Sequence, residues 1–253
     1  MHWMYDVPMG EQLDDDGDSL ESIEGCLTDA QYNRDEHRKA VIDDILDNWV
    51  SQSHNGKFHA ILATSSIPEA IKYYKLFAQR DCGLKTTAVF DPSDGNNESS
   101  IEKIDGIAQM LEDYNSLFGT CFNISGYASF KRDVCARLAH KTPYTAVENE
   151  PSKCLDILIV VDQMLTGYDS KWLNTLYMDK FYKWSNIEMI IQAFSRTNRV
   201  FNDDKPHGII RYYRRPYTMK NIIEYAFEQY SGQKPYGIFV AKLIQNLENM
   251  NAA

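Results

Sequence analysis

Short aliphatic runs alternate with helix-forming segments through most of this 253-residue chain. The most apolar run, residues 155–161, is nearly continuous, which is typical of a strand buried on both faces of a parallel sheet. Strands are expected at residues 58–64, 84–90, 155–161, 173–178 and 208–213, and helices at residues 35–50, 66–80, 101–114, 130–139, 187–198 and 222–249. This alternation predicts an α/β domain with a mainly parallel sheet and flanking helices.

Composition excludes several classes of protein. A chain that is 43% hydrophobic and 25% charged is ordinary for a globular protein, and is neither low-complexity nor wholly disordered. Its longest aliphatic run is far shorter than the roughly 20 apolar residues that a membrane-spanning helix needs. The five cysteines are scattered and include no Cys-x-x-Cys pair, which favours reduced thiols and a cytoplasmic location.

Charge is distributed unevenly along the chain, whose net charge is −10. Residues 1–55 hold fourteen acidic residues and three basic ones, whereas residues 194–216 hold six basic residues and two acidic ones. Because a polyanion responds to the local field, the basic stretch leaves phosphate binding open. Residues 212–217 interleave aromatic and basic side chains, which predicts either a contact with single-stranded DNA or an ordinary strand end. The acidic run Asp14–Asp18 lacks calcium-loop spacing, so we expect a solvated segment there.

A parallel sheet binds ligands in the crevice beyond the carboxyl ends of its strands. Ser65 and Ser66 follow the first of the expected strands and open a helix, so their hydroxyls and the first helical amides together make an anion site. Ser66 and Glu69 also have the spacing of a capping box, and simple capping of the helix is the alternative interpretation.

A second junction of strand and loop follows the most apolar strand. Gly167 permits close approach of the backbone, and Thr166 offers a hydroxyl and an amide to a phosphate. Asp169 can accept hydrogen bonds from a ribose or hold a neighbouring arginine. The alternative is an ordinary turn in which the aspartate caps a helix.

The helix expected at residues 187–198 has two faces. Its apolar residues form one stripe, while Gln192, Arg196 and Arg199 form a second stripe on the opposite side. An amide and two guanidinium groups on one face can reach a bound polyphosphate together, because a planar guanidinium donates two parallel hydrogen bonds. A polar face with two arginines is also common on ordinary amphipathic helices.

Two segments resemble motifs of one enzyme superfamily. The string Val-Val-Asp-Gln-Met-Leu-Thr-Gly-Tyr-Asp, residues 160–169, is similar to motif V of superfamily 2 helicases. Gln-Ala-Phe-Ser-Arg-Thr-Asn-Arg, residues 192–199, resembles motif VI, whose pattern is Gln-x-x-Gly-Arg-x-x-Arg, with Ser195 in place of the glycine. With the text between them, these strings resemble the motor (R) subunit of type I restriction enzymes, over roughly residues 58–215 and most strongly over residues 155–201.

The resemblance implies a three-layer RecA-like domain of the P-loop NTPase type, the second of two in the motor. Arg196 and Arg199 would be arginine fingers for the γ-phosphate of ATP, which the first RecA-like domain would mainly bind together with Mg²⁺. The remaining residues assigned by the resemblance are Gly167, Asp169 and Gln192 for the nucleotide, and Ser65, Ser66 and Thr166 for the DNA backbone.

The resemblance also implies an organisation of the chain and a set of partners. An acidic connecting segment with one amphipathic helix (1–56) would precede the RecA-like domain (57–216), and a helical extension (217–253) would follow it. The implied activity is ATP-driven translocation of double-stranded DNA. No membrane is expected among the partners. The implied partners are DNA, the modification and specificity subunits, and the first RecA-like and nuclease domains of the same subunit.

Motifs that the complete reaction needs are absent from the sequence. It contains no Gly-x-x-x-x-Gly-Lys-Ser/Thr loop, no Asp-Glu-x-His-like box after an aliphatic strand, and no convincing acidic cluster followed by Glu-x-Lys. We therefore expect a fragment that neither hydrolyses ATP nor cuts DNA by itself. Two alternatives stay open, namely part of another superfamily 2 helicase and a stand-alone α/β module that binds a nucleotide or a protein.

Overall fold

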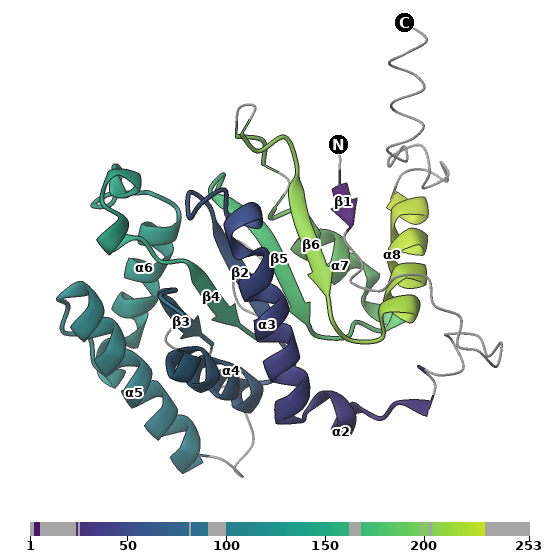
Figure 1. Ribbon diagram of the computed structural model, residues 1–253, viewed down its shortest axis with the longest axis horizontal. Coiled ribbons are helices and arrows are strands. Elements are labelled where there is room, and N and C mark those ends of the chain that lie inside the picture. Colours follow the sequence, from purple (N-terminus) through teal and green to yellow (C-terminus); the bar gives the residue numbers. More distant parts are fainter. Residues whose placement is uncertain are drawn as a thin grey trace, which may run out of the picture.

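The computed structural model (Figure 1) describes residues 3–5, 24, 26–80, 82–90, 100–161, 168–197, 199–201 and 204–230. The described strands are β1 (Trp3–Tyr5), β2 (His59–Thr64), β3 (Thr86–Val89), β4 (Ile157–Val160), β5 (Leu173–Asp179) and β6 (Gly208–Tyr212). The α-helices are α2 (Asp29–Tyr32), α3 (Asp35–Gln52), α4 (Ile67–Arg80), α5 (Ser100–Phe118), α6 (Tyr127–Leu138), α7 (Ile187–Phe194) and α8 (Pro216–Tyr230). Short 3-10 helices are η1 (Ile124–Gly126), η2 (Val147–Asn149), η3 (Pro151–Lys153) and η4 (Trp184–Asn186).

The described strands form one parallel sheet in the order β1-β6-β5-β2-β4-β3. Strands β2, β4 and β5 lie at its centre and are buried along their whole length, which explains the aliphatic runs in the sequence. In the register of the sheet, Ala63 of β2 pairs with Val160 of β4, and Thr64 of β2 pairs with Asp179 of β5. The carboxyl ends of these three strands therefore lie together at one edge of the sheet.

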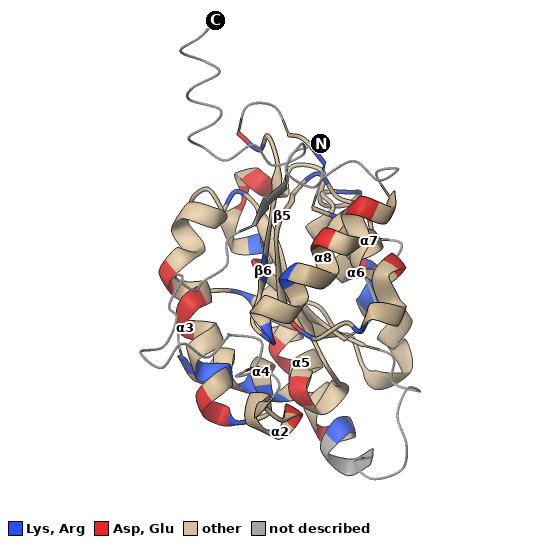
Figure 2. Cartoon of the chain, turned by 90° about the vertical axis from the view of Figure 1, so that its right-hand side faces the viewer, with Lys and Arg blue, Asp and Glu red and all other residues tan. Residues whose placement is uncertain are grey.

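Helices cover both faces of the sheet and make three layers. Figure 2 shows β5 and β6 between α3 on one side and α6, α7 and α8 on the other. This is the α/β arrangement of a RecA-like domain, so the predicted fold class is confirmed. None of the helices in the described part of the chain combines the length and the apolar character that crossing a membrane requires.

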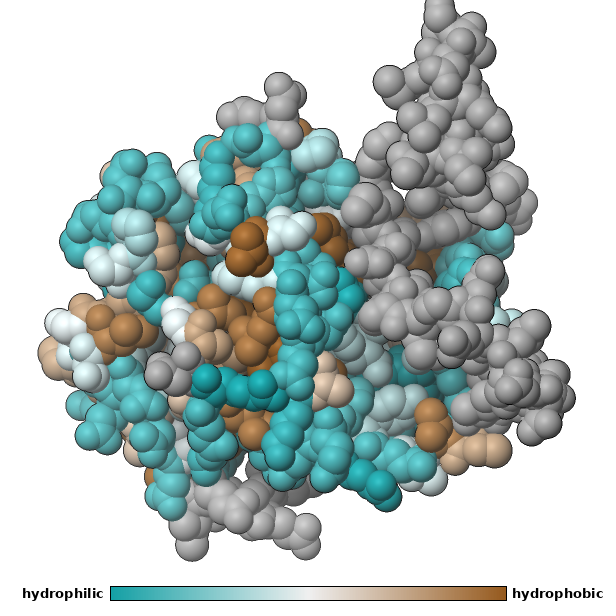
Figure 3. Space-filling model, viewed as in Figure 1, coloured by the Kyte–Doolittle hydropathy of each residue, from teal (hydrophilic) through white to brown (hydrophobic). Residues whose placement is uncertain are grey.

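The hydrophobic core lies between the sheet and these helices. Ile42 and Ile45 of α3, Phe130 of α6 and Phe194 of α7 are all fully buried. Seen from the side of α3, the surface is mainly hydrophilic, and apolar side chains gather near the centre of this face (Figure 3). All five cysteines are free thiols, as predicted.

The region before residue 35 contains two elements that the sequence did not predict. Strand β1 pairs with β6 in parallel, with Trp3 opposite Gly208, and the short helix α2 precedes α3. A strand of three residues is too short to show a period in the sequence, so pattern reasoning missed it. The acidic run Asp14–Asp18 lies outside the described residues, as does the part of the predicted C-terminal helix beyond Tyr230.

Candidate functional site

The serines predicted to contact DNA lie at the carboxyl edge of the sheet. Thr64 Oγ1 donates to the carbonyl oxygen of Val160 at 3.1 Å and so links the ends of β2 and β4. Ser65 is exposed immediately after β2. Ser66 Oγ accepts the amide of Glu69 at 3.4 Å in the first turn of α4, which is the capping role. The structure therefore places both serines where β2 passes into a helix, as predicted.

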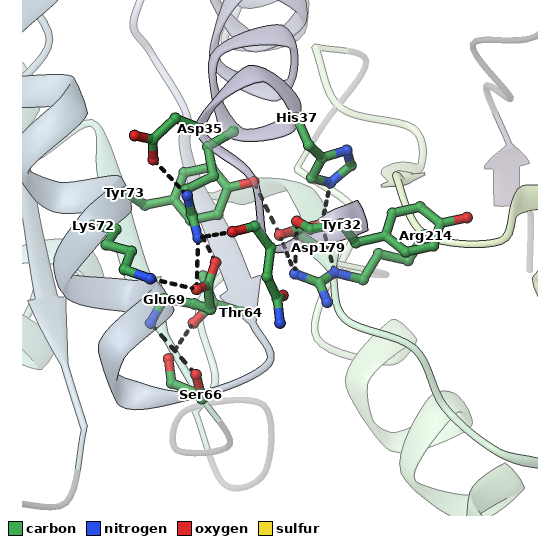
Figure 4. Close-up of polar contacts among 12 residues, drawn as sticks. Tyr32, Asp35, His37, Thr64, Ser66, Glu69, Lys72, Tyr73, Asp179 and Arg214 are labelled. Atoms are coloured by element: carbon green, nitrogen blue, oxygen red, sulfur yellow. Dashed lines mark hydrogen bonds and ion pairs between the residues drawn. The ribbon is translucent and has the colours of Figure 1, made fainter. Parts of the chain in front are cut away.

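The second half of the predicted capping box does not form. Glu69 is 4% exposed, and its two carboxylate oxygens accept hydrogen bonds from Arg38 Nε and Nη2, each at 2.7 Å. This contact ties α4 to α3 in the group of side chains drawn in Figure 4. A buried carboxylate is stabilised more by a bidentate guanidinium than by one backbone amide, so the capping-box prediction is wrong for Glu69.

Asp179 ends β5 and is the centre of a buried network at the same edge (Figure 4). Its carboxylate lies 2.8 Å from His37 Nε2, accepts the hydroxyl of Tyr73 at 2.9 Å, and accepts Arg214 Nε and Nη2 at 2.9 and 3.0 Å. Burial by itself raises the pKa of Asp179, but the hydrogen bonds from His37 and Arg214 outweigh it and hold the pKa below its usual range.

Three arginines of the basic stretch form ion pairs with aspartates elsewhere in the chain. Arg214 binds the buried Asp179, Arg211 Nη2 lies 2.7 Å from Asp44 Oδ1, and Arg215 Nη2 lies 3.4 Å from Asp29 Oδ1. Asp29 and Asp44 both belong to the acidic residues 1–55, so part of the charge asymmetry in the sequence is neutralised where the two regions pack together. Arg214 is 5% exposed and committed to Asp179, which for this arginine favours the ordinary strand end over a contact with DNA.

Val160 ends β4 at the carboxyl edge of the sheet, whereas Tyr168 lies at the amino edge. Thr166 and Gly167 lie outside the described residues, so the contacts predicted for them stay predictions. The hydroxyl of Tyr168 lies 3.0 Å from Nε2 of His59, which is the first residue of β2. Asp169 follows and is therefore at the amino edge. Burial lowers the pKa of His59 well below its usual range, which keeps this imidazole neutral.

Helix α7 ends at Phe194, whereas the helix was expected to continue to residue 198. Side chains take up its last carbonyl groups: Ser195 Oγ donates to the carbonyl oxygen of Gln192 at 2.7 Å, and Thr197 Oγ1 donates to that of Phe194 at 3.1 Å. Hydroxyl groups that bond nearby carbonyls compete with the helical hydrogen-bond pattern. Gln192 is exposed on α7, but the two predicted arginines follow the helix, and the prediction of one continuous polar stripe is wrong.

The two arginines nevertheless contact the segment that carries Asp169. Arg199 Nε forms an ion pair with Asp169 Oδ1, and Arg196 Nη1 donates to the carbonyl oxygen of Tyr168 at 3.3 Å. The side chains of Arg199 and Asp169 are 58% and 46% exposed. Residues 30 positions apart thus present one carboxylate and two guanidinium groups near the surface, where a ligand can reach them.

This group of charges lies at the amino edge of the sheet. Gly208 begins β6, and a Cβ atom placed on it would lie 2.4 Å from the side chain of Thr197 and 2.5 Å from its carbonyl oxygen. Only glycine fits between the turn after α7 and the start of β6. Because α7 runs back from the carboxyl end of β5 to the amino end of β6, its end must lie at this edge. The predicted crevice at the carboxyl ends holds Ser65 and Ser66, and the Asp169–Arg199 pair lies at the opposite edge.

A buried lysine beneath this turn was not predicted. Lys205 is fully buried, and its Nζ donates to the carbonyl oxygens of Arg199 at 2.7 Å and Lys171 at 3.3 Å. Burial lowers its pKa to about 8. In the sequence, Lys205 is one more basic residue in a basic stretch, and nothing there indicates that it is buried.

Comparison with known proteins identifies relatives of this chain. Residues 56–215 match the family described as type I restriction enzyme subunit R domain 3. The type I restriction enzyme SsaAORF53P endonuclease subunit of Staphylococcus saprophyticus is 32% identical over 213 residues, which are 81% of this chain and 22% of that protein. The SauMRSORF196P endonuclease subunit of Staphylococcus aureus is 31% identical over 200 residues, which are 76% of this chain and 20% of that protein. The HindI endonuclease subunit of Haemophilus influenzae is 42% identical over 60 residues, which are 23% of this chain and 5% of that protein.

The family match covers the part of the chain that holds the site. Residues 56–215 include strands β2 to β6, the two serines at the carboxyl edge and the Asp169–Arg199 pair at the amino edge. The chain spans between 20% and 22% of the length of the two staphylococcal relatives. Over these residues, the chain belongs to the family of type I restriction enzyme R subunits, as their domain 3.

Proposed function

We propose that this domain is one half of an ATP-driven DNA motor in the R subunit of a type I restriction enzyme. Its amino edge would face ATP and Mg²⁺ held mainly by a first RecA-like domain, and its carboxyl edge would face double-stranded DNA. The complete subunit would also carry the nuclease domain and would assemble with the modification and specificity subunits. By itself, the domain would supply half of each site and would neither hydrolyse ATP nor cut DNA.

The Asp169–Arg199 ion pair carries this proposal. Both side chains are about half exposed, in contrast to Arg214 of the basic stretch, which is committed to the buried carboxylate of Asp179. Asp169 holds the guanidinium at Nε, so the two terminal nitrogens can face a ligand. In this role Arg199, with Arg196 beside it, would stabilise the charge that develops on the γ-phosphate during hydrolysis. Gln192, exposed on the preceding helix, would contact the nucleotide or the attacking water. Gly167, two residues before Asp169 in the sequence, would let the backbone approach the nucleotide closely.

The separation of the two edges supports a motor rather than a simple nucleotide-binding domain. The serines and the arginines lie at opposite ends of the same parallel strands, so a nucleotide and a DNA strand can be bound at once. Ser65, Ser66 and Thr166 would bind backbone phosphates through hydroxyls and amides, which read no base sequence. Sequence-independent contacts are what a protein that moves along DNA requires.

The arginine role is tested by Arg199→Ala in the complete R subunit. We expect ATP hydrolysis to fall by about 10³-fold or more, the range that arginine fingers contribute, while subunit assembly is unchanged. Arg80→Ala is the matched control, because Arg80 is also a half-exposed arginine in an ion pair, 2.6 Å from Asp43 of α3. Near-normal hydrolysis in the Arg199 variant would remove the finger role.

The DNA role is tested by combining Ser65→Ala with Thr166→Ala in the complete R subunit. We expect weaker binding to DNA of any sequence, because phosphate contacts carry no base information. Affinity measured over a series of salt concentrations should show the same loss on unrelated DNA sequences. Unaltered binding and translocation would contradict the assignment of this edge to the DNA backbone.

A further inference from the structure

Lys205 lies where the two segments of the candidate nucleotide site approach each other. Its ammonium group donates to the carbonyl oxygen of Arg199 at 2.7 Å and to that of Lys171 at 3.3 Å. Lys171 is two residues after Asp169, so each acceptor belongs to the segment of one partner of the Asp169–Arg199 ion pair. One buried side chain thus fixes the backbone on both sides of that pair.

The backbone of Lys205 is also held by hydrogen bonds. The amide of Phe201 donates to the carbonyl oxygen of Lys205 at 3.0 Å, and the amide of Lys205 donates to that of Phe201 at 3.1 Å. This isolated antiparallel bridge folds the chain back beneath the arginine turn. The aromatic rings of Phe58, Trp172 and Phe201 contact one another at the same edge, with centroids 4.5 to 6.1 Å apart. The ammonium therefore has a rigid support.

Burying the ammonium of Lys205 costs free energy, so a lysine is expected here only if its donors make contacts that an apolar side chain cannot make. A buried lysine is usually paired with a carboxylate, but the side-chain acceptors described for Lys205 are both carbonyl oxygens. Its lowered pKa reflects that cost of burial. What the ammonium provides is several donors at the end of a long stem, enough to bind two separate backbone segments.

We propose that Lys205 is a positioning residue, which holds the backbone of Arg199 against the segment of Asp169 so that the Arg199 guanidinium stays at the exposed amino edge. Lys205 is buried and would not touch the nucleotide itself. The proposal deepens the proposed function and rests on it for the consequence on catalysis. The structural part, that Lys205 holds the turn, stands on its own and is tested separately.

Hydrogen–deuterium exchange of this chain tests the structural part. In Lys205→Met, which keeps the length of the side chain but removes its donors, exchange in peptides covering residues 168–171 and 199–201 is expected to be at least about tenfold faster, as local opening of the turn becomes easier. Exchange in β2 and β4 should not change. Lys153→Met is the matched control, because Lys153 also precedes the amino end of a strand but pairs with Glu150 at the surface, where both side chains are about half exposed. Unchanged exchange in the Lys205 variant would overturn the proposal.

A double-mutant cycle in the complete R subunit tests the consequence for catalysis. Lys205→Met alone is expected to lower kcat for ATP hydrolysis about 10- to 100-fold, with KM changed by less than about threefold, because small displacements of a catalytic group have effects of this size. In the Arg199→Ala background, the same change is expected to have no further effect, since Lys205 acts through Arg199. Independent, multiplying losses would overturn the positioning role.

The two arms separate the failure of each idea. Near-normal hydrolysis in Arg199→Ala would remove the arginine-finger role. The exchange measurement would still support or overturn the role of Lys205 in holding the turn. If Lys205→Met fails to fold, Lys205→Gln replaces it in both arms, because it keeps two donors on a shorter stem. Its exchange in residues 168–171 and 199–201 is expected to be faster, and its kcat lower, than in the wild type, and wild-type values would overturn the proposal.

Discussion

The two edges of the sheet hold their charges in opposite ways. At the carboxyl edge, Asp179 and Glu69 are buried and each accepts hydrogen bonds from an arginine at 2.7 to 3.0 Å. At the amino edge, the Asp169–Arg199 pair is about half exposed. The buried charge there, Lys205, binds carbonyl oxygens.

This contrast separates charges that hold the fold from charges available to a ligand. A buried ion pair has little capacity left for another partner, and breaking it leaves a charge without compensation. An exposed pair contributes little to stability but can rearrange around an incoming phosphate. Changes at the carboxyl edge should therefore affect unfolding most, while changes to the exposed pair should affect it least.

The largest effect on stability is expected for Asp179→Asn. The guanidinium of Arg214 would stay buried beside a neutral amide, so the free energy of unfolding should fall by about 3–5 kcal/mol in urea denaturation at pH 7. Asp204→Asn is the control, because Asp204 pairs with Lys57 in solvent, and its unfolding midpoint should not move. A loss below about 1 kcal/mol for Asp179→Asn would break the comparison between the edges.

A somewhat smaller effect is expected for Glu69→Leu. Arg38 would lose its bidentate partner but keep the carboxylate of Asp35 at 2.6 Å, so the loss should be about 2–3 kcal/mol. The double variant with Arg38→Met should return to within about 1 kcal/mol of the wild type, because both buried charges are then gone. Thermal or urea unfolding of the two variants measures this. A double variant that is more than about 1 kcal/mol less stable than the wild type would show that the pair itself contributes net stability.

Alkaline pH sharpens the comparison from the amino edge. The pKa of Lys205 is about 8 in the folded chain and 10.5 in the reference state, so the unfolded chain binds more protons between these values. Stability contributed by this group therefore rises with pH across that window, by about 2 kcal/mol between pH 7 and pH 9.5. The stability of Lys205→Met should not show this rise. Subtracting its free energy of unfolding from that of the wild type at each pH removes the contribution of the other titrating groups. Parallel pH curves would contradict the lowered pKa.

The smallest effect on stability is expected for Asp169→Asn. Its ion pair with Arg199 is about half exposed, so the free energy of unfolding should change by less than about 0.5 kcal/mol. Differential scanning calorimetry beside Asp179→Asn compares the two aspartates directly. A loss as large as that of Asp179→Asn would show that the amino edge is also structural.

The sequence predicted the elements better than their long-range partners. Aliphatic runs located β2 to β6 because strands at the centre of a parallel sheet are apolar throughout. Periodicity could not show that α7 ends at Phe194, because side-chain hydroxyls decide that end. Nor could local spacing show that Glu69 binds Arg38 instead of capping α4, since Arg38 comes from another helix.

The candidate site was predicted in its members more than in its location. The motif strings named Asp169, Arg196 and Arg199, which the fold brings together. The general rule for parallel sheets predicted the carboxyl edge, but the contact of Tyr168 with His59 and the return of α7 to the start of β6 place these residues at the amino edge. Lys205 was missed because burial depends on what covers a residue, and no pattern around Lys205 reports it.

The close contact between Gly208 and Thr197 gives an uncharged residue control over where the arginine turn lies. The turn after α7 packs directly against the backbone of Gly208, the first residue of β6, and leaves no room for a side chain there. The methyl group of an alanine at position 208 would clash with Thr197 and displace that turn from the sheet. The position of the Arg196 and Arg199 guanidinium groups at the amino edge therefore depends in part on the absence of a side chain at Gly208.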